Sequence, residues 1–247
     1  MDVLTIFHLL TLIVSAFLCR MPFLNFPMDD DFAIYTYRAR FAKKGFLWKD
    51  DLQIIGIPMW KMMLFDKIFS SSDKGHLRIR HLQTLFHAAA CLSIYWVILV
   101  ATQNQWAAFT GGLLYSFYGT SPDLTAGSFN FEQFYIPFIF AGLAFLLNGA
   151  VFYAGLCFGF AVICKCTMII YAGVLSPVTW ISYGETPVVI FALTVSSVIL
   201  LSNAIDWVLG FWDAQSIKQI KTRMATTMRI TKTKSLHFSI CYEIYLL

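Results

Sequence analysis

Long apolar runs recur along this chain and determine the solvent in which it can fold. A helix that crosses the hydrocarbon of a bilayer needs about 20 mostly apolar residues and satisfies its backbone hydrogen bonds internally. Of 247 residues, 58% are hydrophobic and 13% are charged, which is outside the range of ordinary soluble domains. The sequence therefore predicts an all-α, polytopic integral membrane protein with about six transmembrane helices. The candidate spans are residues 3–19, 82–102, 106–118, 134–147, 151–174 and 187–202, of which the third and fourth are short.

The first apolar run is predicted to be a retained anchor rather than a cleaved signal peptide. Its leading residues include Asp2 but no Lys or Arg, and no A-x-A-like site follows it. We therefore predict one multi-span membrane domain over residues 1–215, with a first polar loop at about 20–80. Residues 216–247 form a basic carboxyl-terminal tail.

Most of the 18 Lys and Arg residues fall in the first polar loop or in the tail. With six spans these two regions would lie on opposite sides of the membrane. The short, net positive tail is the better guide to the cytoplasmic side, because the positive-inside rule weakens for loops of about 60 residues or more. The polar loop and residues 120–133 would then face the external side. A cytoplasmic polar loop is the alternative, favoured by its raw number of basic residues.

Three consecutive acids, Asp29, Asp30 and Asp31, open the polar segment that follows the first span. Residues 32–44 have an apolar and a basic helical face, and residues 54–69 are rich in Met, Trp and Phe, so both are predicted to be short interfacial helices. The acids could cap a helix N-terminus. Alternatively, one of these carboxylates is a general base at the membrane surface.

The run from Asp31 to Arg40 reads DFAIYTYRAR and is followed by Gly45, Asp50 and Pro58. It resembles the first-loop pattern of GT-C superfamily membrane glycosyltransferases, the family 39-like enzymes related to protein mannosyltransferases and lipid A aminoarabinose transferase. In that family an Asp, often followed by Glu, opens a Tyr- and Ala-containing interfacial helix. Here Asp31 is followed by Phe32, so the acidic pair could instead be Asp30 and Asp31. The motif covers roughly the first 60 residues, and the topology extends the likeness to about residue 200, the amino-terminal part of such an enzyme.

The resemblance implies transfer of a sugar, a hexose or a pentose, from a polyprenyl-phosphate carrier to a lipid, glycan or protein acceptor at the external membrane face. Asp31, or Asp30 in the shifted register, would be the catalytic base. No cofactor is expected, although a divalent metal remains open, and no nucleic-acid partner is expected. We expect a multi-pass protein of a cell envelope, in a bacterial inner membrane rather than the endoplasmic reticulum.

Four further side chains are candidates for substrate binding. Arg78 and Arg80 lead into the second apolar run and could bind a lipid phosphate, because a guanidinium matches phosphate oxygens, or could anchor the helix at headgroup level. Lys61 invites the same two interpretations. Glu132 could bind an acceptor, or could be a solvated loop carboxylate. Lys165 stands inside the apolar run 151–174, where a charge is costly, so it is predicted to face the bundle interior or a cavity. No metal site is predicted, since the cysteines and histidines lack metal-ligand spacing.

Two other classes of protein remain open. The first is a non-catalytic or truncated membrane subunit that binds lipid-linked glycan or a partner protein. The second is a transporter or flippase, in which Lys165 and the loop acids would line the pathway. The sequence shows no convincing internal repeat of the kind that many transporters contain.

Overall fold

The computed structural model describes residues 2–24, 75–120 and 132–208, and these residues are helical with no strand among them. The first predicted span is α1, Val3–Arg20. Asp2 caps it, because its Oδ1 atom accepts a hydrogen bond of 2.9 Å from the backbone N–H of Thr5. The remaining helices are α5 (Gly75–Thr102), α6 (Gln105–Tyr118), α7 (Glu132–Leu147), α8 (Val151–Cys164), α9 (Ile169–Tyr183) and α10 (Glu185–Val208).

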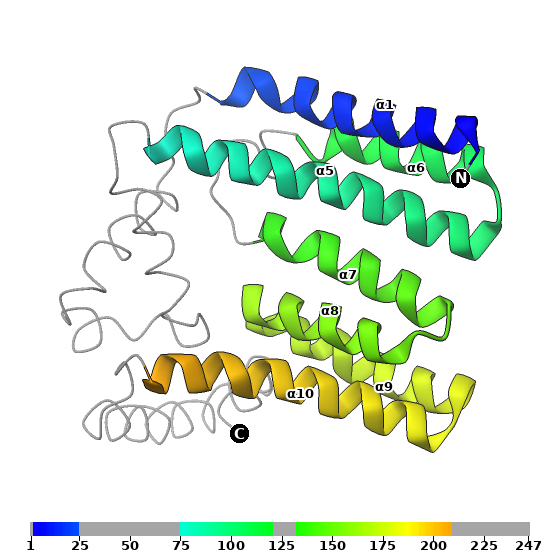
Figure 1. Cartoon of the computed structure of the whole chain (residues 1–247), viewed down its shortest axis with the longest axis vertical. Coiled ribbons are helices and arrows are strands. Elements are labelled where there is room, and N and C mark those ends of the chain that lie inside the picture. Colours follow the sequence, from blue (N-terminus) through cyan, green and yellow to red (C-terminus); the bar gives the residue numbers. More distant parts are fainter. Residues whose placement is uncertain (1, 25–74, 121–131, 209–247) are drawn as a thin grey trace, which may run out of the picture.

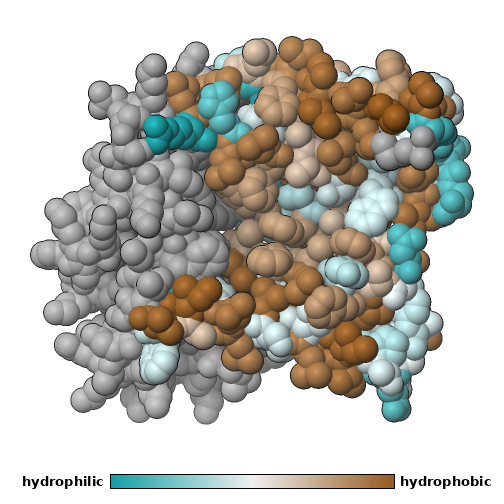
Figure 2. All heavy atoms as spheres, in the orientation of Figure 1, coloured by the Kyte–Doolittle hydropathy of each residue, from teal (hydrophilic) through white to brown (hydrophobic). Residues whose placement is uncertain are grey.

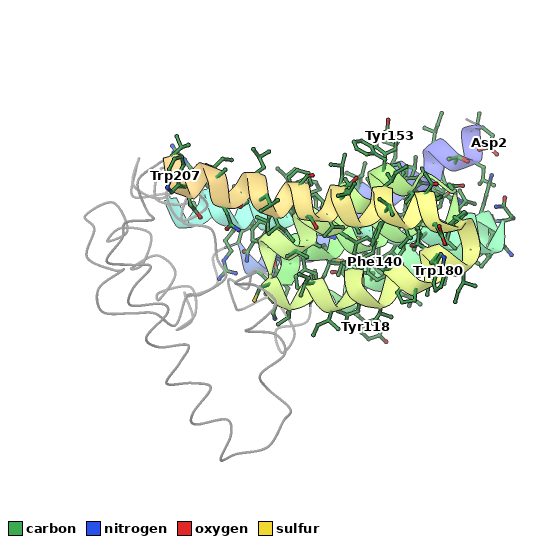
Figure 3. All side chains as sticks on the ribbon, turned by 90° about the horizontal axis from the view of Figure 1, so that it is seen from below. Asp2, Tyr118, Phe140, Tyr153, Trp180 and Trp207 are labelled. Atoms are coloured by element: carbon green, nitrogen blue, oxygen red, sulfur yellow. The ribbon has the colours of Figure 1, made fainter. Side chains whose placement is uncertain are left out.

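The helices run alongside one another and alternate in direction along the chain (Figure 1). Short connections at residues 103–104, 148–150 and 184 lie at one end, which we call the turn end. The helix ends that flank residues 25–74 and 121–131 lie at the opposite end, which we call the loop end. Asp2 lies at the turn end and Trp207 at the loop end (Figure 3).

Neighbouring helices follow a simple order across the bundle. Helices α1, α5 and α6 pack together, α5 packs on α7, and α7 packs on α8. Helix α10 then covers α8, and α9 lies against α10. A group of buried apolar side chains lies among α7, α8, α9 and α10, and includes Phe158 and Phe191.

Four of these helices are long and apolar enough to cross a membrane: Val3–Phe23, Arg80–Thr102, Cys166–Tyr183 and Glu185–Val208. Two shorter apolar helices, Gln133–Leu147 and Val151–Cys164, lie between them. Many large apolar side chains on the outside of the bundle are exposed, among them Leu10, Ile181 and Leu201. Figure 2 shows hydrophobic side chains over much of the visible face. Such a surface suits lipid rather than water, which confirms the predicted class of membrane protein.

The predicted span at 151–174 is wrong as a single helix. Helix α8 ends at Cys164, Lys165 has an extended backbone, and a short turn at Cys166–Met168 leads into α9. Helix α9 runs back to the turn end, where the hydroxyl of Tyr183 donates a hydrogen bond of 2.6 Å to the carbonyl oxygen of Leu146 at the end of α7. Since α8 ends at the loop end, the half-buried Lys165 that follows it lies beyond the helix rather than within a span, where a charge would be costly.

This reversal changes the predicted topology. Helices α1 and α10 both end at the loop end (Figure 1), so the segments that follow them do not leave the bundle at opposite ends, as six alternating spans required. The other five predicted spans each fall within a helix, namely α1, α5, α6, α7 and α10. The predicted interfacial helices and the tail at 216–247 lie outside the described residues.

Helices α8 and α10 run in the same direction and approach closely at two glycines. A Cβ atom on Gly155 would stand 2.8 Å from Cβ of Thr194, and one on Gly159 would stand 2.7 Å from Cβ of Val198. Small residues permit such approach, which is the usual source of helix packing in lipid.

Candidate functional site

Buried polar side chains gather at the loop end of α1, α5, α6 and α7. Helix α5 contributes a stripe at three- and four-residue spacing, which places its members on one helical face. The group consists of Arg20, Arg80, Gln83, Thr84, His87, Ser116 and Gln133, all of them buried. In a bundle whose surface is so apolar, this polar cluster is the best candidate for a functional site.

Arg20 is the last residue of α1, and its side chain is only 3% exposed. Its Nη2 atom donates a hydrogen bond of 2.9 Å to Oε1 of Gln133, near the start of α7. Its Nη1 atom is buried and has no hydrogen-bond partner in the described part of the chain. The guanidinium is therefore held by one neutral amide and keeps a donor available.

Arg80, in the second turn of α5, is also only 3% exposed. Its Nη1 atom donates to Oε1 of Gln83 over 3.4 Å, and its backbone carbonyl accepts a hydrogen bond of 2.8 Å from the hydroxyl of Thr84. Arg80 stands near enough to Arg20 for the two charges to repel each other. We call Arg20, Arg80, Gln83 and Gln133 the arginine site.

His87 lies on α5 one helical turn after Gln83 and Thr84. Its Nε2 atom lies 3.2 Å from the carbonyl oxygen of Ser116, to which it donates, and its ring stacks on Tyr115 with centroids 5.3 Å apart. A Cβ atom at Gly119 would stand 2.9 Å from the His87 ring. The glycine at the end of α6 therefore makes room for the imidazole.

The chemistry of the arginine site is that of anion binding. Two guanidinium groups lie near each other within this polar cluster, and the amide oxygens of Gln83 and Gln133 that accept hydrogen bonds from them are neutral. A buried cation is costly unless it is compensated. Guanidinium offers a planar set of donors that matches the oxygens of a phosphate or carboxylate.

The structure brings only one of the predicted site residues, Arg80, into this cluster. Arg78 is exposed on α5, two positions away and thus on another side of the helix. Glu132 begins α7, directly before Gln133, and only its backbone is described. The predicted base, Asp31 or Asp30, and Lys61 lie outside the described residues.

Sequence reasoning missed Arg20, Gln83 and Gln133. A signal for part of the site was present, because Arg80, Gln83, Thr84 and His87 recur at helical spacing within an apolar segment. Arg20 was assigned to the start of the polar loop, although it belongs to α1. Nothing in the sequence pairs Arg20 with Gln133, 113 residues later.

A second buried ionisable group at the loop end was also missed. Asp206 lies near the end of α10 and is buried, as is Ser202 one turn earlier. In the register set by Gly155 with Thr194 and Gly159 with Val198, Asp206 lies beyond the end of α8, at the level of the break after Lys165. Both charged side chains thus belong to the loop end, like the arginine site.

Metal ligands do not assemble among the described residues: in residues 2–24, 75–120 and 132–208, no three His, Cys, Asp or Glu side chains are placed to hold an ion. The acids at residues 29–31 lie outside these ranges, so a divalent metal there stays an open prediction.

No protein-family model, curated protein or solved structure matches this chain. Its class follows from its own geometry: it is an all-helical membrane protein with a buried arginine pair at one end of the bundle.

Proposed function

We propose that this chain is a membrane glycosyltransferase that moves a sugar from a polyprenyl-phosphate carrier to a lipid, glycan or protein acceptor in a bacterial inner membrane. The external face is proposed from the resemblance to GT-C enzymes alone, because α1 and α10 both end at the loop end and the tail no longer marks the opposite side. The observation that supports it best is the buried pair Arg20 and Arg80 at the loop end of an apolar bundle. The resemblance of the segment around Asp31 to GT-C enzymes supports it independently.

The charge of the donor suits the arginine site. A sugar linked to a prenyl phosphate carries one negative charge, and breaking the bond between sugar and phosphate leaves more negative charge on the phosphate oxygens. Fixed cations placed at this point stabilise the transition state more than the bound donor, which is the condition for catalysis. Arg20 supplies a buried Nη1 donor for this role.

The depth of the site suits a lipid headgroup. Arg20 and Arg80 lie near the loop-end limits of the two candidate spans Val3–Phe23 and Arg80–Thr102, the depth at which polar headgroups would begin if these helices cross a bilayer. The apolar surface of the bundle then offers lipid-filled surroundings for the isoprenoid tail. This arrangement accounts for a phosphate site on so hydrophobic a protein.

Connectivity supports the predicted base. The segment 25–74, which carries Asp30 and Asp31, joins the end of α1 to the start of α5, the two helices that hold the arginines. One of these acids would take a proton from the acceptor. Glu132, next to Gln133, and Lys61 and Arg78 remain proposed contacts to the acceptor or the carrier.

The test is sugar transfer in membranes that express the chain, with a radiolabelled polyprenyl-phosphate sugar as donor. Arg20→Gln and Arg80→Gln are expected to lower the rate about 100-fold, the size typical of removing one charge-stabilising donor. The control is Thr102→Ala, which removes an exposed polar side chain at the turn end of the same helix. Asp30→Asn and Asp31→Asn identify the base.

The alternatives give different results in the same experiment. A non-catalytic subunit shows no transfer with any donor, yet retains arginine-dependent binding of the carrier. A flippase moves the lipid between leaflets without breaking the sugar–phosphate bond. Transfer that survives both arginine variants would overturn the proposed role of the arginine site.

A further inference from the structure

A second group of buried polar atoms lies toward the turn end, away from the arginine site. His8 on α1 is 0% exposed, and neither Nδ1 nor Nε2 has a hydrogen-bond partner among the described residues. Tyr95 on α5 is 3% exposed, and its hydroxyl oxygen likewise has no partner there. The two rings are neighbours, with centroids 6.3 Å apart and planes at 67°.

Aromatic side chains of α6 close the remaining sides of the imidazole. The ring of Phe109 stacks on His8 with centroids 4.4 Å apart, and Trp106 meets it at 66° with centroids 4.9 Å apart. These contacts bury the ring without satisfying its nitrogen atoms. A neutral imidazole always has one N–H donor and one acceptor nitrogen, and buried polar atoms are almost always hydrogen-bonded.

We propose that His8 and Tyr95 together bind one water molecule, which bridges the imidazole to the phenol hydroxyl. Water can accept from one side chain and donate to the other, and buried waters typically bond to two to four polar groups. The ring N–H that does not face the water would lie against an aromatic face, a weak but recognised contact. A metal is a poorer guest, since no three ligating side chains meet in the described part of the chain.

The bridge joins α1 to α5 by a directional contact. Apolar neighbours such as Leu12 on α1 and Leu92 on α5 hold these helices together but only loosely specify the rotation of α1 about its axis. A water bound to His8 selects one rotation. Because α1 ends in Arg20, the same contact also fixes where that guanidinium lies.

A double-mutant cycle tests the proposal on the full chain in detergent or nanodiscs. His8→Phe and Tyr95→Phe are each expected to lower the melting temperature by about 2–4 °C, the shift that corresponds to one lost net interaction in a chain of this size. The double variant should melt close to the lower of the two singles, because either substitution already breaks the bridge. Tyr153→Phe, at an exposed tyrosine, is the control and should change nothing.

A rise in the melting temperature of the variants would contradict the proposal. If no water is bound, each substitution removes an unsatisfied buried group and raises the melting temperature. Fully additive losses would mean that the two side chains act separately. Either result would overturn the proposal.

A second measurement uses the wild-type protein and therefore does not depend on whether the variants fold. In wild-type protein with ¹⁵N-labelled histidine, the ring nitrogens of His8 should show the shift of a hydrogen-bonded imidazole and a cross-peak to water. His8→Gln assigns the signal and keeps a polar group at the site. Ring nitrogens with unbonded shifts and no water contact would contradict the bridge.

Discussion

The guanidinium of Arg20 donates from Nη2 to Oε1 of Gln133 over 2.9 Å, and this bond joins the end of α1 to the start of α7. Both side chains are buried. The acceptor is an amide, which aligns the arginine without neutralising it. A carboxylate in the same place would make a stronger contact and would remove the positive charge that an anion requires.

Gln133→Glu should therefore separate stability from binding. The variant is expected to fold at least as well as the parent, since the new carboxylate pairs with Arg20. Its affinity for a prenyl monophosphate should fall roughly tenfold or more, the equivalent of about 1.4 kcal/mol. Isothermal titration in nanodiscs with farnesyl phosphate measures this affinity.

The neutral control is Gln133→Met, which has a similar length and no charge. It loses the hydrogen bond but leaves the arginine charge in place, so binding should weaken less than in Gln133→Glu. Equal losses in the two variants would show that the alignment of Arg20 matters and that its charge does not.

Gly159→Ala should disrupt the packing of α8 on α10. The added Cβ atom would stand 2.7 to 3.0 Å from three carbons of Val198, so one helix must shift. We expect a loss of about 1–3 kcal/mol, the usual cost of overpacking a closely packed core. Unfolding by sodium dodecyl sulfate in mixed micelles measures the free energy.

Gly173→Ala is the matched control on α9. Its Cβ atom would meet nothing within 4 Å, so the substitution should be neutral or stabilising by roughly 0.5–1 kcal/mol through helix propensity. A similar loss at both positions would mean that general helix effects, rather than the close approach of α8 and α10, determine stability.

Asp2 should make the turn end sensitive to strong acid. Hydrogen bonds from Thr5, and then from Gln105, lower the pKa of the Asp2 carboxyl from its ordinary value of 3.8 to about 2. The folded protein thus favours the carboxylate, so its contribution to stability is present above pH 4 and is lost as the pH falls from about 4 to about 2. NMR titration of a ¹³C-labelled carboxyl group reports this pKa directly.

Asp2→Asn provides the comparison for this titration. It should lose the part of the stability that the parent loses between pH 4 and pH 2, so the two proteins should become equally stable near pH 2. A carboxyl that titrates near 4 in the folded chain would contradict the capping contact.

The reversal at Lys165 predicts the sidedness of two segments. If the helices cross the membrane as they lie in the bundle, the segment 25–74 and the segment after Val208 face the same compartment. Epitope tags within 25–74 and at the carboxyl end should be cleaved by protease from the same side of sealed vesicles, with a tag before Asp2 protected. If protease cleaved the two tags from opposite sides of the vesicles, the result would support a single span at residues 151–174 and contradict the reversal at Lys165.

Hydropathy predicted the helices well where the apolar runs are uninterrupted. Helices α1, α5 and α10 follow directly from the need to satisfy backbone hydrogen bonds in lipid. The single charge of Lys165 changes the mean hydropathy of a long sequence window only slightly. Nevertheless, α8 ends directly before this residue. The reversal of chain direction depends on the backbone conformation of one residue. The mean hydropathy of the surrounding segment carries no information about that conformation.

The candidate site was predictable only in part. Arg80 was selected because its position before an apolar run suits a phosphate at headgroup level. Its partner Arg20 lies on another helix, and the rotation of α1 that buries it depends on contacts with residues far along the chain, such as Gln133. The proposed catalytic acids and Lys61 lie outside the described residues, so their roles remain predictions.

The parallel packing of α8 on α10 gives the chain an order of assembly during synthesis. The glycines at 155 and 159 meet residues of α10, and the whole of α9 separates these partners along the sequence. Ribosomes deliver about 5–20 residues per second, so α8 enters the membrane seconds before its neighbour exists. During that interval the glycine face of α8 lacks its partner helix, and the packing of α8 is completed only when α10 arrives beside it.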